Sequence, residues 1–79
     1  MKPDDLSRLE AIFREVLALP VDADFKKVRQ LNQAAWDSLG HVTLMAAIEG
    51  EFAIALDTSE MLELTSFEAV RLFLEGKGL

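Results

Sequence analysis

Hydrophobic residues in the first part of the chain recur every three or four positions, as they do along one face of an α-helix. They are Leu6, Leu9, Ile12, Phe13, Val16 and Leu17. Pro3 suits a position in the first turn of a helix, and Pro20 follows the last residue of the pattern. The pattern therefore predicts a first helix from about residue 3 to residue 18.

A second helical pattern begins near the middle of the chain. Its apolar positions are Leu39, Val42, Met45, Ile48 and Phe52. This spacing predicts a helix from about Ser38 to Glu51, with these side chains on the face that packs against the core. The apolar run from Phe52 to Leu56 has the composition of a strand, but no second strand is available to pair with it. We interpret it as an extended, buried connection.

Two further helices are predicted in the last part of the chain. The first is a short helix that continues through Leu64 and has three good candidate N-caps, Asp57, Thr58 and Ser59. Thr65, followed three residues later by Glu68, has the spacing of a capping box and predicts the start of the last helix. The apolar face of this helix and the glycines that end it are Phe67, Val70, Leu74, Gly76 and Gly78.

The segment between the first two helices, Pro20 to Trp36, has no clean helical period. Phe25, Val28 and Leu31 are spaced by three and predict a short turn that pins this long loop to the core. A loop of this length in a small domain usually has a function or is disordered. The fold class predicted for residues 1–79 is a single all-α domain: a small four-helix bundle of three main helices and one short helix.

Composition excludes several kinds of site. The chain has 79 residues and no cysteine, so it forms neither disulfides nor thiolate metal sites. Its single histidine, His41, cannot build a zinc site, and it has no partner arrangement that would activate a nucleophile as in a hydrolase. The glycines form no phosphate-binding loop. We therefore expect a protein that is not an enzyme and holds no metal.

The net charge of −6 is unevenly distributed. Acidic and basic residues balance from Met1 to Ala35, whereas from Trp36 onward only Arg71 and Lys77 oppose the acidic residues. Such a field repels nucleic acid and anionic lipid and attracts basic protein partners, although acidity also simply keeps a small domain soluble. The N-terminal residues MKPDDLSRLE are charged from the second position, and the longest uncharged run, Ser38 to Ile48, is too short to span a bilayer. We expect a soluble, cytoplasmic monomer.

Ser38 lies where the second helix begins, in the sequence WDSLGHVTLM. Spacing alone favours a plain N-cap, but Asp37 offers a second one, and neither residue is followed at the third position by the Glu or Gln of a capping box. A serine at this place also presents its hydroxyl where free backbone N–H groups and the helix dipole would stabilise an attached phosphate, typically by ~0.3–1 kcal/mol.

These residues resemble a known family. The tripeptide Asp37-Ser38-Leu39, within this order of elements, is similar to the D-S-L motif of the acyl carrier protein family. The resemblance covers nearly the whole chain and continues through the second helix in Val42, Leu44, Ile48, Glu49, Glu51 and Phe52.

The resemblance implies that a phosphopantetheinyl transferase moves 4′-phosphopantetheine from coenzyme A to the Ser38 hydroxyl. The thiol at the end of this arm would then carry an acyl or aminoacyl group as a thioester between enzymes. Asp37 matches the acid of the motif, which in the family assists the transferase and its magnesium ion. Leu39 matches the leucine, for which helical spacing favours packing over partner contact.

The sequence departs from the family pattern around the motif. Trp36 precedes the acid, and Gly40, His41 and Thr43 stand where carriers of fatty acid synthesis often have acidic residues. These departures favour a dedicated carrier for a particular pathway over the central fatty acid carrier. The candidate partner contacts are Trp36, Gly40, His41, Thr43, Glu49 and Glu51.

For three of these residues an alternative is open. Trp36 is either an anchor of the loop on the core or an exposed contact for a partner. Gly40 either allows close approach by the arm or a partner, or is merely tolerated in a first turn, where it costs ~1 kcal/mol relative to alanine. For His41 the favoured interpretation is an exposed residue without a special role.

The expected partners are the transferase, an acyl- or aminoacyl-activating ligase, and condensing or acyl-transfer enzymes. The identity of the carried group stays open, because many acyl groups ride on the same thiol. The alternative hypothesis is an unmodified helical adaptor with a carrier-like fold.

Overall fold

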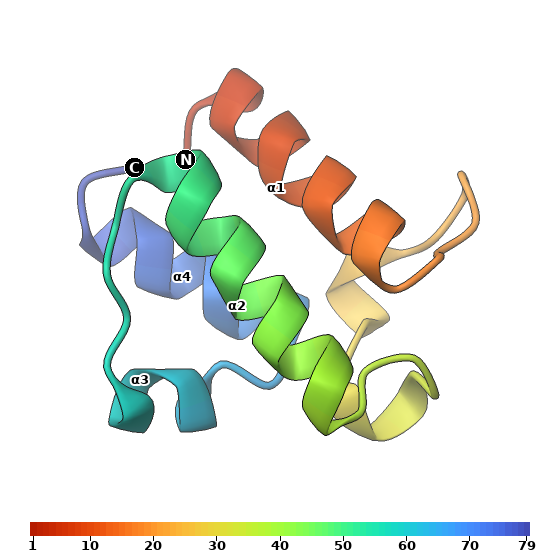
Figure 1. Ribbon diagram of the computed structural model, residues 1–79. Coiled ribbons are helices and arrows are strands. Elements are labelled where there is room, and N and C mark those ends of the chain that lie inside the picture. The colour runs from red at the N-terminus through yellow and green to blue at the C-terminus, as the bar shows by residue number, and fades with distance from the viewer.

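A computed structural model describes all residues from Met1 to Leu79. It contains four α-helices, α1 (Pro3–Val16), α2 (Ser38–Phe52), α3 (Thr58–Glu63) and α4 (Phe67–Gly76), and two short 3₁₀ turns, η1 (Phe25–Lys27) and η2 (Gln30–Asn32). α1 and α2 lie side by side and run in opposite directions, with α4 behind them (Figure 1). There is no strand, so the predicted all-α fold is confirmed.

The core is a single cluster in which every buried residue is hydrophobic. Phe13 of α1 lies at its centre: its ring meets the Trp36 ring edge-on at a centroid distance of 5.5 Å and the Phe67 ring at 4.9 Å. Such edge-to-face pairs contribute about 0.5–1.5 kcal/mol beyond the burial of their area. The first helix, the end of the loop and the last helix are therefore fastened to one another through aromatic contacts.

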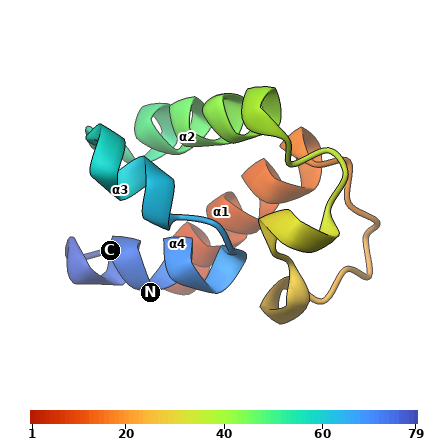
Figure 2. The ribbon, with the colours of Figure 1, turned by 90° about the horizontal axis from the view of Figure 1, so that it is seen from below.

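The long loop is held by backbone pairing as well as by side chains. Val28 is buried as predicted, and the loop beside it pairs with the link between α3 and α4 (Figure 2). Gln30 N–H donates to the Thr65 carbonyl at 2.9 Å, and Phe67 N–H donates to the Val28 carbonyl at 3.1 Å. The prediction that Leu31 pins the loop is wrong, because its side chain is 99% exposed. Two separate 3₁₀ turns replace the single turn that the spacing predicted.

α2 covers the predicted residues and one more, but its buried face is rotated. The buried side chains are Leu44, Met45, Ile48 and Phe52. Leu39 and Val42 are 75% and 64% exposed, so their predicted packing against the core is wrong. The inward face passes through His41 in the first turn, one helical turn before Leu44 and Met45. The polar His41 therefore lies on the inward face, where the hydrophobic pattern predicted its neighbours Leu39 and Val42.

The segment after α2, predicted as an extended and buried connection, is buried only in part. Phe52 ends the helix, Ala53 adopts a left-handed conformation with φ of 54°, and Leu56 is buried while Ala53 and Ala55 are exposed. Asp57 caps α3 as predicted: its carboxylate accepts the Glu60 N–H at 2.7 Å.

The predicted cap of α4 is wrong by one residue. Ser66, not Thr65, is the N-cap, and its hydroxyl accepts the Ala69 N–H at 3.0 Å. The Thr65 carbonyl is instead bonded to the loop, at Gln30. The apolar face of α4, formed by Phe67, Val70 and Leu74, is buried as predicted.

Candidate functional site

Ser38 is the first residue of α2, and its side chain is free. The N-cap of the helix is Asp37, whose carboxylate accepts the Gly40 N–H at 2.8 Å. Ser38 is exposed, and its hydroxyl makes no hydrogen bond within the protein. The interpretation of Ser38 as a plain N-cap is therefore wrong: the adjacent aspartate performs that role, and the serine hydroxyl stays available for chemistry.

The residue before this cap is an anchor. Trp36 is only 2% exposed, so its side chain is buried against Phe13 and cannot be a partner contact. Its indole N–H donates to Nδ1 of His41 at 2.9 Å. Of the two roles considered for Trp36, the anchor of the loop is the one found, and it fixes the backbone immediately before Asp37 and Ser38.

His41 is half-buried and bonded at both ring nitrogens. Besides accepting from Trp36, its ring lies 2.7 Å through Nε2 from the Met61 carbonyl oxygen of α3. The interpretation of His41 as an exposed residue without a special role is wrong. Hydrophobic periodicity does not indicate this contact, because the pattern assigns inward positions only to apolar residues. A histidine can nevertheless face inward when both of its ring nitrogens are hydrogen-bonded.

Gly40 has a structural reason that sequence reasoning missed. A Cβ at this position would lie closer than 3.0 Å to the Ala35 carbonyl oxygen, and 3.3 Å from the Asp37 carboxylate. The turn from Ala35 to Asp37 folds back so tightly over the first turn of α2 that no side chain fits. Neither the arm nor a partner is needed to explain this glycine.

The remaining candidate partner contacts on α2 already make bonds within the protein. Thr43 is exposed, and its hydroxyl donates to the Leu39 carbonyl of the preceding turn at 2.9 Å. The Glu49 carboxylate accepts the Leu56 N–H at 2.8 Å and so holds the connection to α3. Glu51 is paired with Arg8 of α1 at 3.1 Å, and this hydrogen bond raises the pKa of the arginine. Both acids of α2 thus serve contacts within the protein.

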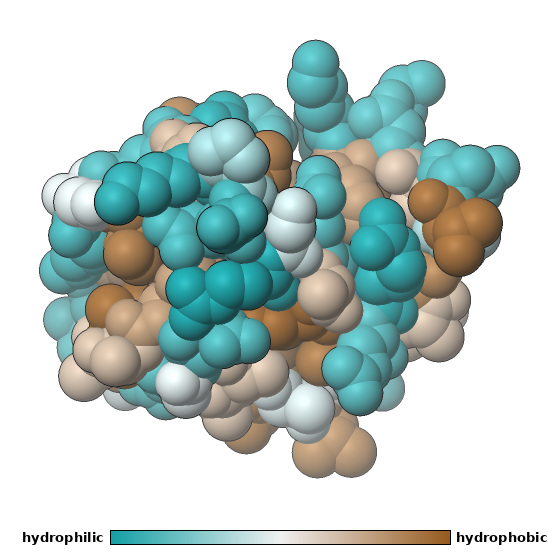
Figure 3. Space-filling view, turned by 90° about the horizontal axis from the view of Figure 1, so that it is seen from above, coloured by the Kyte–Doolittle hydropathy of each residue, from teal (hydrophilic) through white to brown (hydrophobic).

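Three exposed hydrophobic side chains lie on α2 and α3. Leu39 and Val42 extend from the first two turns of α2, and Leu62 of α3, which is 72% exposed, follows the residue whose carbonyl contacts His41. We call Leu39, Val42 and Leu62 the apolar surface. On the face of the molecule seen from above, hydrophilic residues predominate and hydrophobic residues form small groups (Figure 3).

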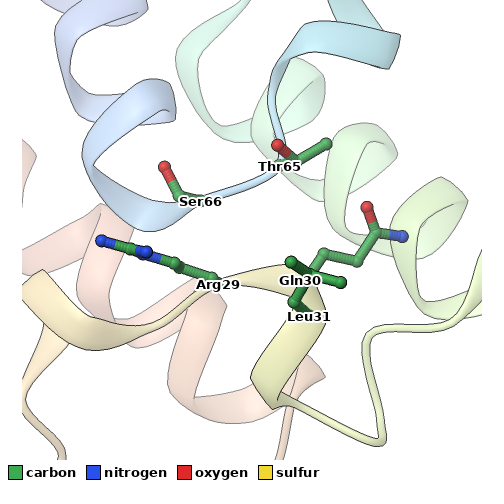
Figure 4. Close-up of a pocket in the computed structure, with 5 residues that line it drawn as sticks. All are labelled: Arg29, Gln30, Leu31, Thr65 and Ser66. Atoms are coloured by element: carbon green, nitrogen blue, oxygen red, sulfur yellow. The ribbon is translucent and has the colours of Figure 1, made fainter.

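No cleft of the structure lies at Ser38. The best-formed one has a volume of about 510 Å³ and lies between η2 and the link before α4, where Arg29, Gln30, Leu31, Thr65 and Ser66 line it (Figure 4). The other two lie along the loop and α4, and none is lined by a residue of α2. No cluster of three or more His, Cys, Asp or Glu side chains could bind a metal, and no helix has the length and apolarity needed to cross a membrane.

The comparisons with known proteins agree with this geometry. Residues 7–74 match the family model described as the phosphopantetheine attachment site, and this range includes Ser38. Neither the curated proteins nor the solved structures gave a match. Members of the family bear the 4′-phosphopantetheine prosthetic group and are carriers without catalytic activity. With a match over most of its length and a free serine at the start of a helix, this chain belongs to the phosphopantetheine-binding family, as a carrier protein of the acyl carrier protein type.

Proposed function

We propose that Ser38 is the attachment residue and that the loaded protein carries an acyl or aminoacyl group between enzymes of a dedicated pathway. The single observation that carries this proposal is the division of roles at the start of α2. Asp37 caps the helix, so the exposed Ser38 hydroxyl can form a phosphodiester without any loss of helix capping. Ser38 Oγ would bond to the phosphorus of the phosphopantetheine, and the remainder of coenzyme A would leave.

The surroundings of Ser38 fit a phosphate. Its place at the first position of a 15-residue helix puts an attached phosphodiester near the N-terminal N–H groups, where a helix stabilises an anion by about 0.3–1 kcal/mol. Asp37, the adjacent acid, accepts the Gly40 N–H and stands in the place that the family motif gives to the residue that assists the transferase. The bound arm supplies a thiol for thioester formation, and the protein supplies only its anchoring point.

The partners of the carrier would recognise an apolar rather than a strongly acidic surface. Leu39 and Val42 are exposed on the first two turns of the helix that Ser38 begins, whereas Glu49 is bonded to the Leu56 N–H and the exposed Glu51 is paired with Arg8. This distribution supports a dedicated carrier over the central carrier of fatty acid synthesis, whose partners read an acidic second helix. We infer that the partners are a transferase, an activating ligase and an acyl-accepting enzyme. We also infer that the carrier is a monomer and acts in the cytoplasm.

The test is a mass measurement on the intact protein. Incubation with coenzyme A and a broad-specificity transferase is expected to add one phosphopantetheinyl group to the wild type and none to Ser38→Ala. Ser59→Ala is the matched control, because Ser59 is also exposed and lies in the first turn of a helix, and it should be modified like the wild type.

Two results would contradict the proposal. One is an unchanged wild-type mass with a transferase that modifies another carrier in the same experiment. The other is a stoichiometric complex with a cellular partner that forms without modification and survives Ser38→Ala, because this would favour an adaptor.

A further inference from the structure

His41 has a defined proton arrangement. The indole Nε1–H of Trp36 is only a donor, so Nδ1 of His41 must be the acceptor in the 2.9 Å bond between them. The proton of the neutral imidazole is then on Nε2, which donates it to the Met61 carbonyl oxygen at 2.7 Å. Both nitrogens are used, and the ring forms a continuous bridge from the buried tryptophan through α2 to α3.

α3 has few other polar connections to the rest of the molecule. Met61 is partly buried against the core, no residue of α3 is fully buried, and the hydrogen bonds of Asp57 and Glu60 serve its own cap. Its other polar link is an ion pair between Glu60 and Lys77 with a distance of 3.7 Å, and Lys77 is largely exposed. The bond from His41 is therefore the one side-chain hydrogen bond between α2 and α3. The Met61 carbonyl also accepts the Leu64 N–H at 3.3 Å, so this oxygen receives both the bond that closes α3 and the bond from α2.

Each residue joined by this bond is followed in the sequence by an exposed hydrophobic residue. Val42 follows His41 on α2, and Leu62 follows Met61 on α3. A helix of six residues is too short to hold its place by its own backbone bonds, so its position depends on tertiary contacts. Loss of the bond from His41 would remove the one side-chain hydrogen bond between the two helices, so α3 and Leu62 should be held less firmly against the start of α2.

We propose that His41 is a positioning residue that holds α3 against the start of α2, so that the two helices keep one arrangement beside Ser38 for the transferase that modifies it. His41 itself contacts neither the arm nor the partner. The docking part of this inference rests on the proposed function, whereas the coupling of α3 to α2 does not.

Two amide substitutions separate the two bonds of the ring. In His41→Asn the short amide places its oxygen near the position of Nδ1, so it can still accept from Trp36 but cannot reach Met61. In His41→Gln the longer side chain places an N–H₂ group near the position of Nε2, so it can still donate to the Met61 carbonyl. The variants differ by one methylene, and each retains one of the two bonds.

The first measurement is hydrogen–deuterium exchange of the segment 58–64, with α4 as the internal reference. His41→Asn is expected to speed exchange in this segment about 5-fold relative to the wild type, the factor that corresponds to one hydrogen bond of about 1 kcal/mol. His41→Gln should leave the segment near the wild-type rate, and α4 should be unchanged in both. Equal exchange of the segment in the two variants would overturn the coupling.

The second measurement is the kinetics of modification by a transferase. His41→Asn is expected to raise the KM for the carrier about 2- to 5-fold with kcat unchanged, and His41→Gln to restore the wild-type KM. If exchange responds but KM does not, α3 is coupled to α2 without serving the partner, and the docking role is refuted. A wild type that is not modified at all refutes the proposed function instead, and the exchange comparison still decides the coupling.

Discussion

Replacing Gly40 by alanine should destabilise the protein, although the same change at Gly50 should stabilise it. Both glycines lie in α2, where alanine is favoured over glycine by up to about 1 kcal/mol per residue. A Cβ at Gly50 would meet nothing within 4 Å, so this variant should gain most of that energy. Gly50 is thus a matched control within one helix.

At Gly40 the same gain is outweighed by steric overlap. The added Cβ would lie closer than 3.0 Å to the Ala35 carbonyl oxygen, which is backbone and cannot rotate away. Forcing an extra methyl into a filled space typically costs about 1–3 kcal/mol, and displacement of Asp37 would also weaken a cap worth about 1 kcal/mol. After subtraction of the helix-propensity gain, a net loss of about 1–2 kcal/mol is expected.

The assay is urea denaturation followed by helical circular dichroism and by the emission of Trp36, the only tryptophan. With an unchanged m-value, the midpoint should fall for Gly40→Ala and rise for Gly50→Ala. In thermal unfolding, 1 kcal/mol corresponds to about 4–8 °C for a domain of this size. Equal stabilisation by both substitutions would refute the reasoning, because it would show that the turn from Ala35 to Asp37 yields without cost.

Three further outcomes test the core, the surface and the ion pairs. Phe13→Ala should lower stability by about 3–5 kcal/mol in urea denaturation, since it removes a fully buried ring with two aromatic partners. Leu39→Ala and Val42→Ala should each change stability by less than about 0.5 kcal/mol but weaken binding of a partner enzyme in a titration, and equal binding would refute the proposed apolar surface. The hydrogen bonds from Arg71 lower the pKa of Glu68 below the usual 4.5, so the folded state favours the ionised carboxylate. This contribution is present above about pH 4.5 and is lost as the pH falls through the lowered pKa; in Glu68→Gln this part of the acid-induced decline of the urea midpoint should be absent.

Periodicity located α1 and α4 because their apolar faces are regular. In α4, Phe67, Val70 and Leu74 repeat at helical spacing and are all buried. The prolines and caps that mark the ends of helices act over a few residues only. Ser38, the proposed attachment residue, could also be found from the sequence, because a short motif acquires meaning from the order of elements around it. Such features depend on local chemistry, which a single sequence displays directly.

The errors arose where contacts between distant segments override local preference. Thr65 has the spacing of a cap, but its carbonyl pairs with Gln30, and this pairing shifts the start of α4 to Ser66. The hydrophobic pattern placed Leu39 in the core, but His41 faces inward instead. No hydrophobicity scale predicts this, because it depends on Trp36 and Met61, which satisfy both nitrogens of the His41 ring. These contacts join residues from different elements, and nothing in the local pattern indicates them.

The residues around the motif share one consequence for function. Trp36 and Gly40 were considered for contacts with a partner or the arm, and each instead helps to place the backbone of Ser38: Trp36 anchors the loop, and Gly40 permits the tight turn before the helix. Asp37, the acid of the motif, also caps the helix. Leu39, assigned to packing, is free. A carrier must hold its attachment point rigidly while exposing what surrounds it, and a buried scaffold beneath an exposed serine and leucine meets both demands. Leu39 and Val42, which the hydrophobic pattern assigned to the core, are therefore exposed on the first two turns of α2, the helix that begins at the proposed attachment residue.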